Sequence, residues 1–179
     1  SESVNRAAIL HENQDPDILR LFGASDAFFR LNEARGISNN GYITGNATRV
    51  LPVSSGGVQT RGFVRSPGGT VRGTLIPDMN GTYIGSFAHK INNDGFAVGR
   101  LVKNDGGTTA ALWNEEGQVA MLDTSNVDNL PQGAALTEAL DINDHGAILA
   151  KGLVNGELHV FILRVGGGLL IFRSASQSY

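Results

Sequence analysis

The sequence predicts an all-β repeat fold made of four-stranded units of about 50 residues, of the kind found in β-propellers. A phrase that opens with Ile and closes with Gly occurs three times, at residues 37–41, 91–95 and 142–146. The 179 residues include 24 Gly and only 7% aromatic residues, which is typical of short strands joined by tight turns. Apolar runs bounded by turn residues also recur after about 50 residues, as a stacked or circular repeat requires.

Each phrase predicts the tip of a β-hairpin. In the second copy, the strand-like segments 87–91 and 96–102 flank the tip residues 92–95. Asn-Gly and Asp-Gly pairs favour tight hairpin turns, because Asn and Gly enter the φ > 0 region at little steric cost. The Ile of each phrase is expected in the core. An Ala stands three residues before that Ile in every copy, which predicts the close approach of a neighbouring strand or sheet: Ala34, Ala88 and Ala139.

A second kind of hairpin alternates with the first. Three apolar runs are each followed by a Gly-containing turn and another apolar run: 62–65 with 71–76, 110–113 with 119–122, and 160–163 with 169–172. Residues 7–22 fit this pattern more loosely. Two hairpins make one four-stranded unit, so residues 1–179 are expected to form a single repeat domain of three and a half units with seven hairpins.

Three and a half units do not close a propeller, which needs at least four blades. The chain is therefore expected to be a fragment of a longer array or to close by pairing with another chain. A β-trefoil is the alternative fold, although its 12 strands fit the predicted 14 less well. Residues 25–36 also have the pattern of a short helix, but the match between segments 31–37 and 136–142 favours a strand.

The composition excludes several classes of function. The formal net charge is −3 and the 14 Lys and Arg residues are scattered singly, so no nucleic-acid surface is expected. The absence of Cys excludes disulfides, thiolate metal sites and cysteine nucleophiles. No run of 18 apolar residues predicts a membrane span, and no signal peptide is recognised in this chain, which begins with Ser1.

Three segments resemble bacterial extracellular repeats of the HAF type. Residues 86–99, 110–113 and 73–75 are similar to that family's S-x-A-x-x-I-N-N-x-G-x-V-V-G, A-F-L-W and G-T-L elements. The resemblance covers residues 7–172, with departures from the family pattern at Arg65, Ala150 and Leu163. It implies a propeller-like repeat fold and export to the cell surface or the medium, and it implies no established reaction.

No catalytic pattern is present, and neither a catalytic residue nor a cofactor site is predicted. The carboxylate pairs Asp15/Asp17 and Glu115/Glu116 lie in expected turns, where solvated charge explains them better than glycoside hydrolysis. The glycine run 166–168 predicts a turn rather than a phosphate cradle. The four His residues are far apart in sequence, which argues against a shared metal site: His11, His89, His145 and His159.

The hairpin tips collect side-chain oxygens, which Ca²⁺ prefers as ligands: Asn92, Asn93, Asp94, Asn143 and Asp144. The complete calcium-loop motif is missing and turn chemistry explains these residues, so the metal question stays open with calcium as the candidate ion. For Trp113, packing between strands or units is favoured over a sugar platform. Asn46 and Asn80 match the glycosylation pattern, which matters only in a eukaryotic secretory pathway.

The functional expectation is a non-enzymatic extracellular module whose loops bind a protein or a glycan. One alternative is a hydrolase or lyase that acts on polysaccharide, which would need convergent carboxylates or His at a channel mouth. The other is a structural repeat whose open sheet edges drive oligomerisation, since unpaired edge strands are templates for another chain.

Overall fold

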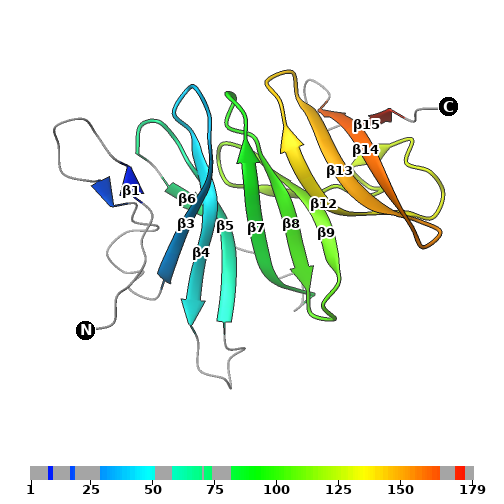
Figure 1. Ribbon diagram of the computed structural model, residues 1–179, viewed down its shortest axis with the longest axis horizontal. Helices are drawn as coiled ribbons and strands as arrows, with labels where there is room; N and C mark the ends of the chain where they lie inside the picture. The colour runs from blue at the N-terminus through cyan, green and yellow to red at the C-terminus, as the bar shows by residue number, and fades with distance from the viewer. Residues whose placement is uncertain are drawn as a thin grey trace.

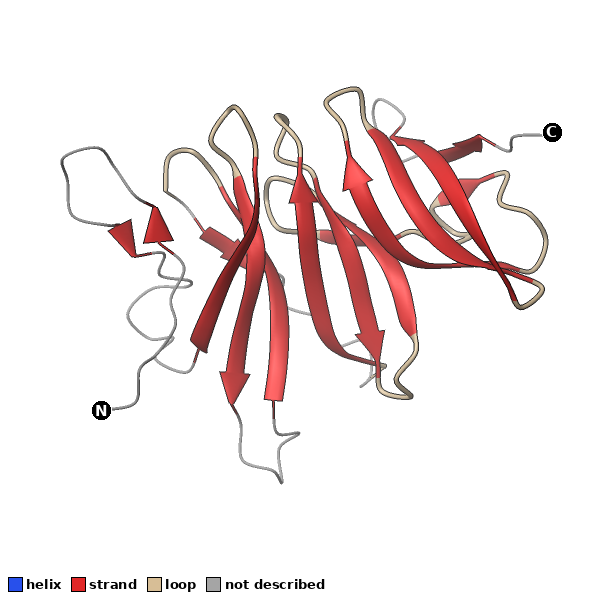
Figure 2. Ribbon diagram, viewed as in Figure 1, coloured by secondary structure: helices blue, strands red, loops and turns tan. Residues whose placement is uncertain are grey.

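The computed structural model describes residues 8–9, 17–18, 29–50, 58–69, 71–73, 82–165 and 172–175. Within these ranges every regular element is a β-strand, and the chain is therefore all-β as predicted (Figure 2). No helix in the described part is long and apolar enough to cross a membrane.

The strands form three separate sheets and one isolated strand pair (Figure 1). Sheet 1 comprises β3 (Phe29–Ile37), β4 (Ile43–Val50), β5 (Val58–Arg65) and β6 (Val71–Gly73). Sheet 2 comprises β7 (Tyr83–Ile91), β8 (Ala97–Lys103), β9 (Thr108–Trp113) and β10 (Val119–Met121). Sheet 3 comprises β12 (Ala134–Ile142), β13 (Ala147–Val154), β14 (Glu157–Val165), β15 (Phe172–Ala175) and β11 (Val127–Asp128). The isolated pair is β1 (Ala8–Ile9) with β2 (Asp17–Ile18).

Most predicted strands are confirmed, and three details differ. The ambiguous segment is strand β3 from Phe29 onward, while residues 25–28 lie outside the described ranges. The two-residue strand β11 pairs in parallel with β15. It was not predicted, because its sequence does not indicate pairing with a strand that lies 45 residues away. The described strands form neither a closed barrel nor a closed ring, whereas a β-trefoil requires a barrel.

The three phrases form hairpin tips of one geometry. In the second tip the Gly95 N–H donates to the Asn92 carbonyl (3.2 Å) and the Asn92 N–H donates to the Phe96 carbonyl (3.0 Å). Gly95 has φ +81°, so the loop is a three-residue turn that ends in a left-handed glycine. The first and third tips repeat these bonds, with Gly41 at φ +82° and Gly146 at φ +71°.

The Asn residues of the tips act through their side chains, and the expectation that they adopt φ > 0 is wrong. Asn92 Oδ1 accepts hydrogen bonds from the backbone N–H groups of Asp94 (3.2 Å) and Phe96 (2.9 Å). Asn143 makes the two equivalent bonds in the third tip, and Ser38 Oγ accepts one from Tyr42 N (3.1 Å) in the first. An Asn or Ser therefore follows the Ile because its short side chain caps the turn.

Sheet 2 packs between the other two sheets. Its face toward sheet 1 buries Trp113 and Ala88, which meet Gly62 and Val64. Its opposite face buries Leu112 and other apolar residues against sheet 3. Sheet 2 therefore buries both of its faces, and sheets 1 and 3 each contribute one face to a core shared with it.

The recurrent Ile and Ala positions are buried in sheets 2 and 3 only. Ile91, Ile142, Ala88 and Ala139 are at most 8% exposed. Ile37 is 72% exposed and Ala34 is also exposed, so the core expectation is wrong for the first copy. The reason is position. β7 and β12 each contact a preceding sheet, whereas β3 belongs to the first described sheet and meets another sheet at Gly36, where β7 approaches, and not at Ile37.

β-Bulges lie at matching places in β3, β7 and β12. In β3 and β7 they lie opposite the glycine that follows the tip, whereas in β12 the residue opposite is Ala150, so the bulge alone does not require glycine. The bulges lie between Ala34 and Gly36, Ala88 and Lys90, and Ala139 and Asp141. Opposite the bulge in β7, a Cβ atom on Gly99 would lie 1.9 Å from the Phe87 carbonyl oxygen. Only a residue without a side chain permits this approach of the two strands.

Gly99→Ala is expected to lower the free energy of unfolding by about 1–3 kcal/mol, because the backbone of β7 has to shift away from the new methyl group. The matched control is Gly68→Ala, since a Cβ there meets no atom within 4 Å. Urea unfolding followed by tryptophan fluorescence measures both. Equal stability of the two variants would contradict the close approach.

Candidate functional site

The first candidate region is the row of three hairpin tips, which lie side by side at one end of the sheets (Figure 1). Asn93 is its centre. Asn93 Oδ1 accepts from Asn40 N (3.1 Å) and its carbonyl accepts from Asn40 Nδ2 (3.0 Å). On the other side, Asn93 N and Nδ2 donate to the two carboxylate oxygens of Asp144, at 2.9 and 2.6 Å. Asn92 Nδ2 adds a bond to the Asn143 carbonyl (3.2 Å).

These bonds join loops that are far apart in sequence and hold them in fixed order. The oxygens proposed as calcium ligands are already in use, since those of Asn92, Asn93, Asn143 and Asp144 accept hydrogen bonds from the protein. Among the described residues no group of three His, Asp or Glu side chains is placed to hold a metal ion. No cofactor was predicted from the sequence, and calcium as the candidate ion is untested.

The second candidate region is a charge cluster around Glu138, a residue of β12 that is 8% exposed. Arg100 Nη1 donates to its Oε1 (2.7 Å), and Lys151 Nζ lies 2.6 Å from its Oε2. His89 Nε2 is 3.0 Å from Oε1 but is not aligned to donate a hydrogen bond. The Arg100 guanidinium also lies over the Phe87 ring, 5.1 Å from its centroid.

The surroundings fix the protonation of this cluster. Burial lowers the pKa of His89; the negative charge of Glu138 opposes this shift and the positive charge of Arg100 adds to it. Burial alone would raise the pKa of Glu138, but the hydrogen bond from Lys151 and the charges of Arg100 and Lys151 lower it overall. Glu138 is thus held ionised and His89 is held neutral at pH 7.

The cluster links two sheets through a buried salt bridge. Glu138 belongs to sheet 3, whereas His89 and Arg100 belong to sheet 2. A buried carboxylate loses its hydration, and the bond from Arg100 across the interface replaces it. A carboxylate held ionised by two cations is a poor proton donor, so the geometry favours a structural role over acid catalysis.

The other residues singled out in the sequence do not converge. His145 is exposed on the third tip, and His159 lies on β14 with its ring centroid 6.4 Å from that of Phe161. Glu115 accepts a hydrogen bond from the Tyr42 hydroxyl (3.0 Å). Trp113 is fully buried between sheets 1 and 2, which confirms the packing role.

One candidate residue from the sequence is buried, and others lie outside the described residues. Asn46 is 3% exposed and its Oδ1 accepts from Ala88 N (2.9 Å), so it is not accessible for glycosylation. The side chains of His11, Asp15, Asp17 and Asn80, and the glycine run 166–168, lie outside the described residues.

Sequence reasoning missed Glu138, Arg100 and Lys151, although a register comparison of the repeats contains a signal. Arg100 and Lys151 both stand five residues after the glycine of their tip, and Glu138 stands four residues before its Ile. These polar residues at fixed offsets from the tips could have indicated a charge cluster from the sequence alone. Which of them meet across an interface depends on the packing of the sheets.

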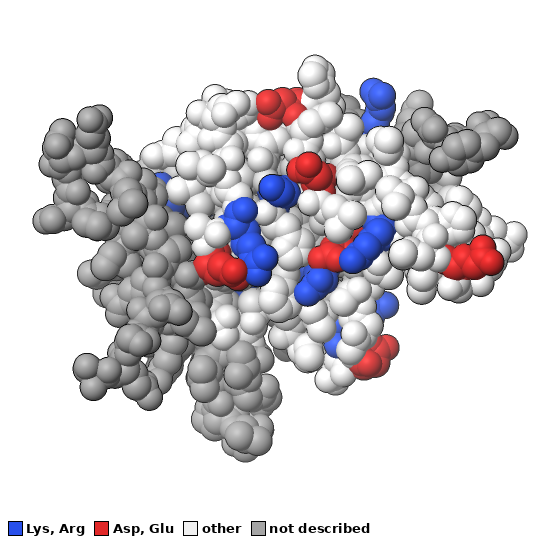
Figure 3. All heavy atoms as spheres, viewed as in Figure 1, with Lys and Arg blue, Asp and Glu red and all other residues white. Residues whose placement is uncertain are grey.

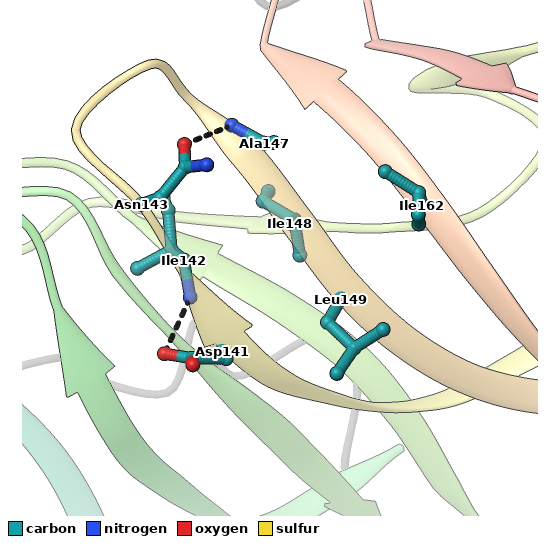
Figure 4. Close-up of a pocket in the computed structure, with 7 residues that line it drawn as sticks. All are labelled: Asp141, Ile142, Asn143, Ala147, Ile148, Leu149 and Ile162. Atoms are coloured by element: carbon teal, nitrogen blue, oxygen red, sulfur yellow. Dashed lines mark hydrogen bonds between the residues drawn. The ribbon is translucent and has the colours of Figure 1, made fainter.

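A hollow of about 210 Å³ lies beside the third tip (Figure 4). Its walls are Asp141, Ile142, Asn143, Ala147, Ile148, Leu149 and Ile162. It is mostly apolar, and its lining includes Leu149 and Ile162 from the outer side of sheet 3. On the face shown in Figure 3, acidic and basic side chains of the described residues are intermixed, and no large patch has one sign of charge.

No protein-family model, no curated protein sequence and no solved structure matches this chain.

Asn92→Ala is expected to lower the free energy of unfolding by about 1–3 kcal/mol, because the backbone N–H groups of Asp94 and Phe96 lose the acceptor that a mostly buried side chain provides. Asn92→Ser is the matched control, since Ser38 performs this capping in the first tip. The Ser variant should retain more than half of the lost stability in urea unfolding at pH 7. Equal losses in both variants would show that the side-chain cap does not stabilise the turn.

The free energy of unfolding is expected to fall as the pH is lowered from 7 to 4. His89 and Glu138 both have a lowered pKa in the folded state, so the unfolded chain binds more protons below pH 6.5 and again below pH 4.5. His89→Gln should flatten the step that begins below pH 6.5, and Glu138→Gln should flatten the step that begins below pH 4.5. Denaturant unfolding at half-unit pH intervals measures both slopes; an unchanged slope in His89→Gln would contradict the assignment.

Proposed function

We propose that the chain is a propeller-type repeat module and that each four-stranded sheet is one blade. Support comes from the strand order, which follows the chain from the inner strand outward as β3-β4-β5-β6 and β7-β8-β9-β10. In sheet 3 the order β12-β13-β14-β15 is the same, with β11 added at the outer edge. Successive sheets also pack face to face, which is how blades stack around a ring.

The function we propose is non-enzymatic binding of an extracellular protein or glycan through the tip row. The observation that carries it is the chain of hydrogen bonds through Asn40, Asn93 and Asp144, which aligns three loops before any ligand arrives. Preorganised loops on a rigid scaffold lose little entropy on binding. The exposed side chains of Asn39, Asp94 and His145 then project from a fixed row.

An extracellular location is part of the same proposal. It rests on the similarity of residues 86–99 and 110–113 to HAF-type repeats. Amide, carboxylate and imidazole groups hydrogen-bond readily to hydroxyl groups, so a glycan is the ligand class to test first.

The test is binding to an array of bacterial, plant and animal polysaccharides and to purified peptidoglycan. We expect at least one glycan to bind, and the triple variant Asn39→Ala/Asp94→Ala/His145→Ala to weaken that binding at least tenfold, about 1.4 kcal/mol. The matched control is Asn104→Ala/Glu157→Ala, which changes an exposed turn residue and the exposed first residue of β14 at the opposite end of the sheets.

The two parts of the proposal fail separately. Binding that persists in the triple variant would place the ligand away from the tips. If no glycan binds, the glycan assignment is wrong, and a protein ligand becomes the target of the same variants.

A further inference from the structure

The outer side of sheet 3 is an exposed apolar surface, which we call the open face. It consists of five side chains that are 38–70% exposed: Leu149, Leu153, Leu158, Val160 and Ile162. These residues share one face because β13 and β14 pair Leu149 with Ile162, Lys151 with Val160 and Leu153 with Leu158. Contiguous apolar surface of this kind marks an interaction site more often than isolated exposed residues do.

The equivalent faces of the other two sheets are covered. Val98 in sheet 2 stands three residues after its tip glycine, as Leu149 does in sheet 3, and Val98 is fully buried beneath sheet 3. Leu112, which pairs with Val98 as Ile162 pairs with Leu149, is buried in the same interface. In sheet 1 the corresponding Val64 is buried beneath sheet 2. The open face therefore has the pattern of a surface that receives another β-sheet.

Polar groups at the open face also follow this pattern. Arg100 in sheet 2 reaches across its interface to Glu138. Lys151 is the residue at the same place in sheet 3; it pairs with Glu138 of its own sheet (2.6 Å), and its side chain is still 40% exposed. Asn92 Nδ2 donates to the carbonyl of the next tip, whereas Asn143 Nδ2 donates to nothing within the described part of the chain. The hollow beside Asn143 lies where a further element would approach.

Among the described residues, the outer side of sheet 1 does not offer a matching free surface. A head-to-tail contact would place the open face against the outer side of sheet 1. On that side Ile43, Ala47 and Phe63 are at most 5% exposed, and Ile37 is the exposed large apolar residue. A second copy can therefore present its own open face more readily than its sheet 1.

We propose that two copies of this chain associate through their open faces about a two-fold axis that runs across the strands. Such an axis keeps Val160 near its symmetry mate and brings Leu158 toward the hollow formed by Leu149 and Ile162 of the other copy. At about 4.8 Å between strands and 3.3 Å per residue, the 9, 8, 9 and 4 residues of β12, β13, β14 and β15 cover roughly 500 Å² per copy. The roughly 1,000 Å² buried in total is the lower limit for a specific interface, so a dissociation constant in the micromolar range is expected. Because one patch meets itself, the assembly closes at the dimer.

The first test is sedimentation equilibrium between about 1 and 200 μM at pH 7. The protein should shift from monomer to dimer, and Leu158→Lys/Val160→Lys should remain monomeric at every concentration. Ile37→Lys is the matched control, since Ile37 is as exposed as Leu158 but lies in sheet 1; it should dimerise normally. Circular dichroism and thermal unfolding verify that each variant is folded.

The second test does not depend on disrupting the surface. The chain has no Cys, so Val160→Cys places a single thiol near the proposed axis. Mild oxidation should convert at least half of this variant to a covalent dimer at a concentration where the protein is dimeric. Ile37→Cys should give less than one tenth of that amount.

Three results would overturn the proposal. A wild-type chain that stays monomeric at 200 μM has no such interface. Loss of the dimer in Ile37→Lys, or growth into larger species, indicates a head-to-tail contact instead. Equal cross-linking of Ile37→Cys and Val160→Cys indicates random collision. None of these results bears on ligand binding by the tips, so the two proposals are judged separately.

Discussion

The capped hairpin tip is the element on which the rest of the structure depends. Within one sheet, the left-handed glycine and the Asn or Ser cap close the turn between the two inner strands and set their register. A register error of one residue would send the buried side chains of β7 to the wrong face. The same tips then bond to one another through Asn40, Asn93 and Asp144, so a local turn also aligns neighbouring sheets.

Two kinds of contact stabilise the interfaces between the sheets. Apolar contacts between Trp113 and Gly62 and around Leu112 supply burial, which is favourable and non-directional. The hydrogen bond from Arg100 to Glu138 orients the two sheets, because it forms only in one alignment of sheets 2 and 3. Burying the ionised carboxylate of Glu138, which is 8% exposed, costs hydration free energy. The positive charges of Lys151 and Arg100 offset this cost.

The two proposed surfaces follow from the same repetition. Tips that recur at one end of every sheet produce a row of polar loops, and a row of this kind suits a ligand. Faces that recur in every sheet produce one covered interface for each neighbouring pair, and they leave the last face of the described series uncovered. Val160 is exposed for this reason, although Ala110, at the equivalent position of sheet 2, is fully buried.

The sequence alone determined the all-β class, the hairpin tips, most strands and the burial of Trp113. These features are local, because turn chemistry and apolar runs act within about ten residues. It also suggested the wrong reason for the Asn residues, since the same letters serve φ > 0 turns and side-chain caps. Asn155 does adopt φ +52° in the turn between β13 and β14, whereas Asn92 and Asn143 cap.

Only the tertiary structure decided which residues meet across sheets. The bonds from Asn93 to Asp144 and from Arg100 to Glu138 span 51 and 38 residues, and no local pattern encodes them. It likewise decided that Ile37 is exposed while Ile91 and Ile142 are buried, although the three share one phrase. The phrase specifies a turn, but burial depends on whether another sheet lies against it, and that is a property of the assembled fold.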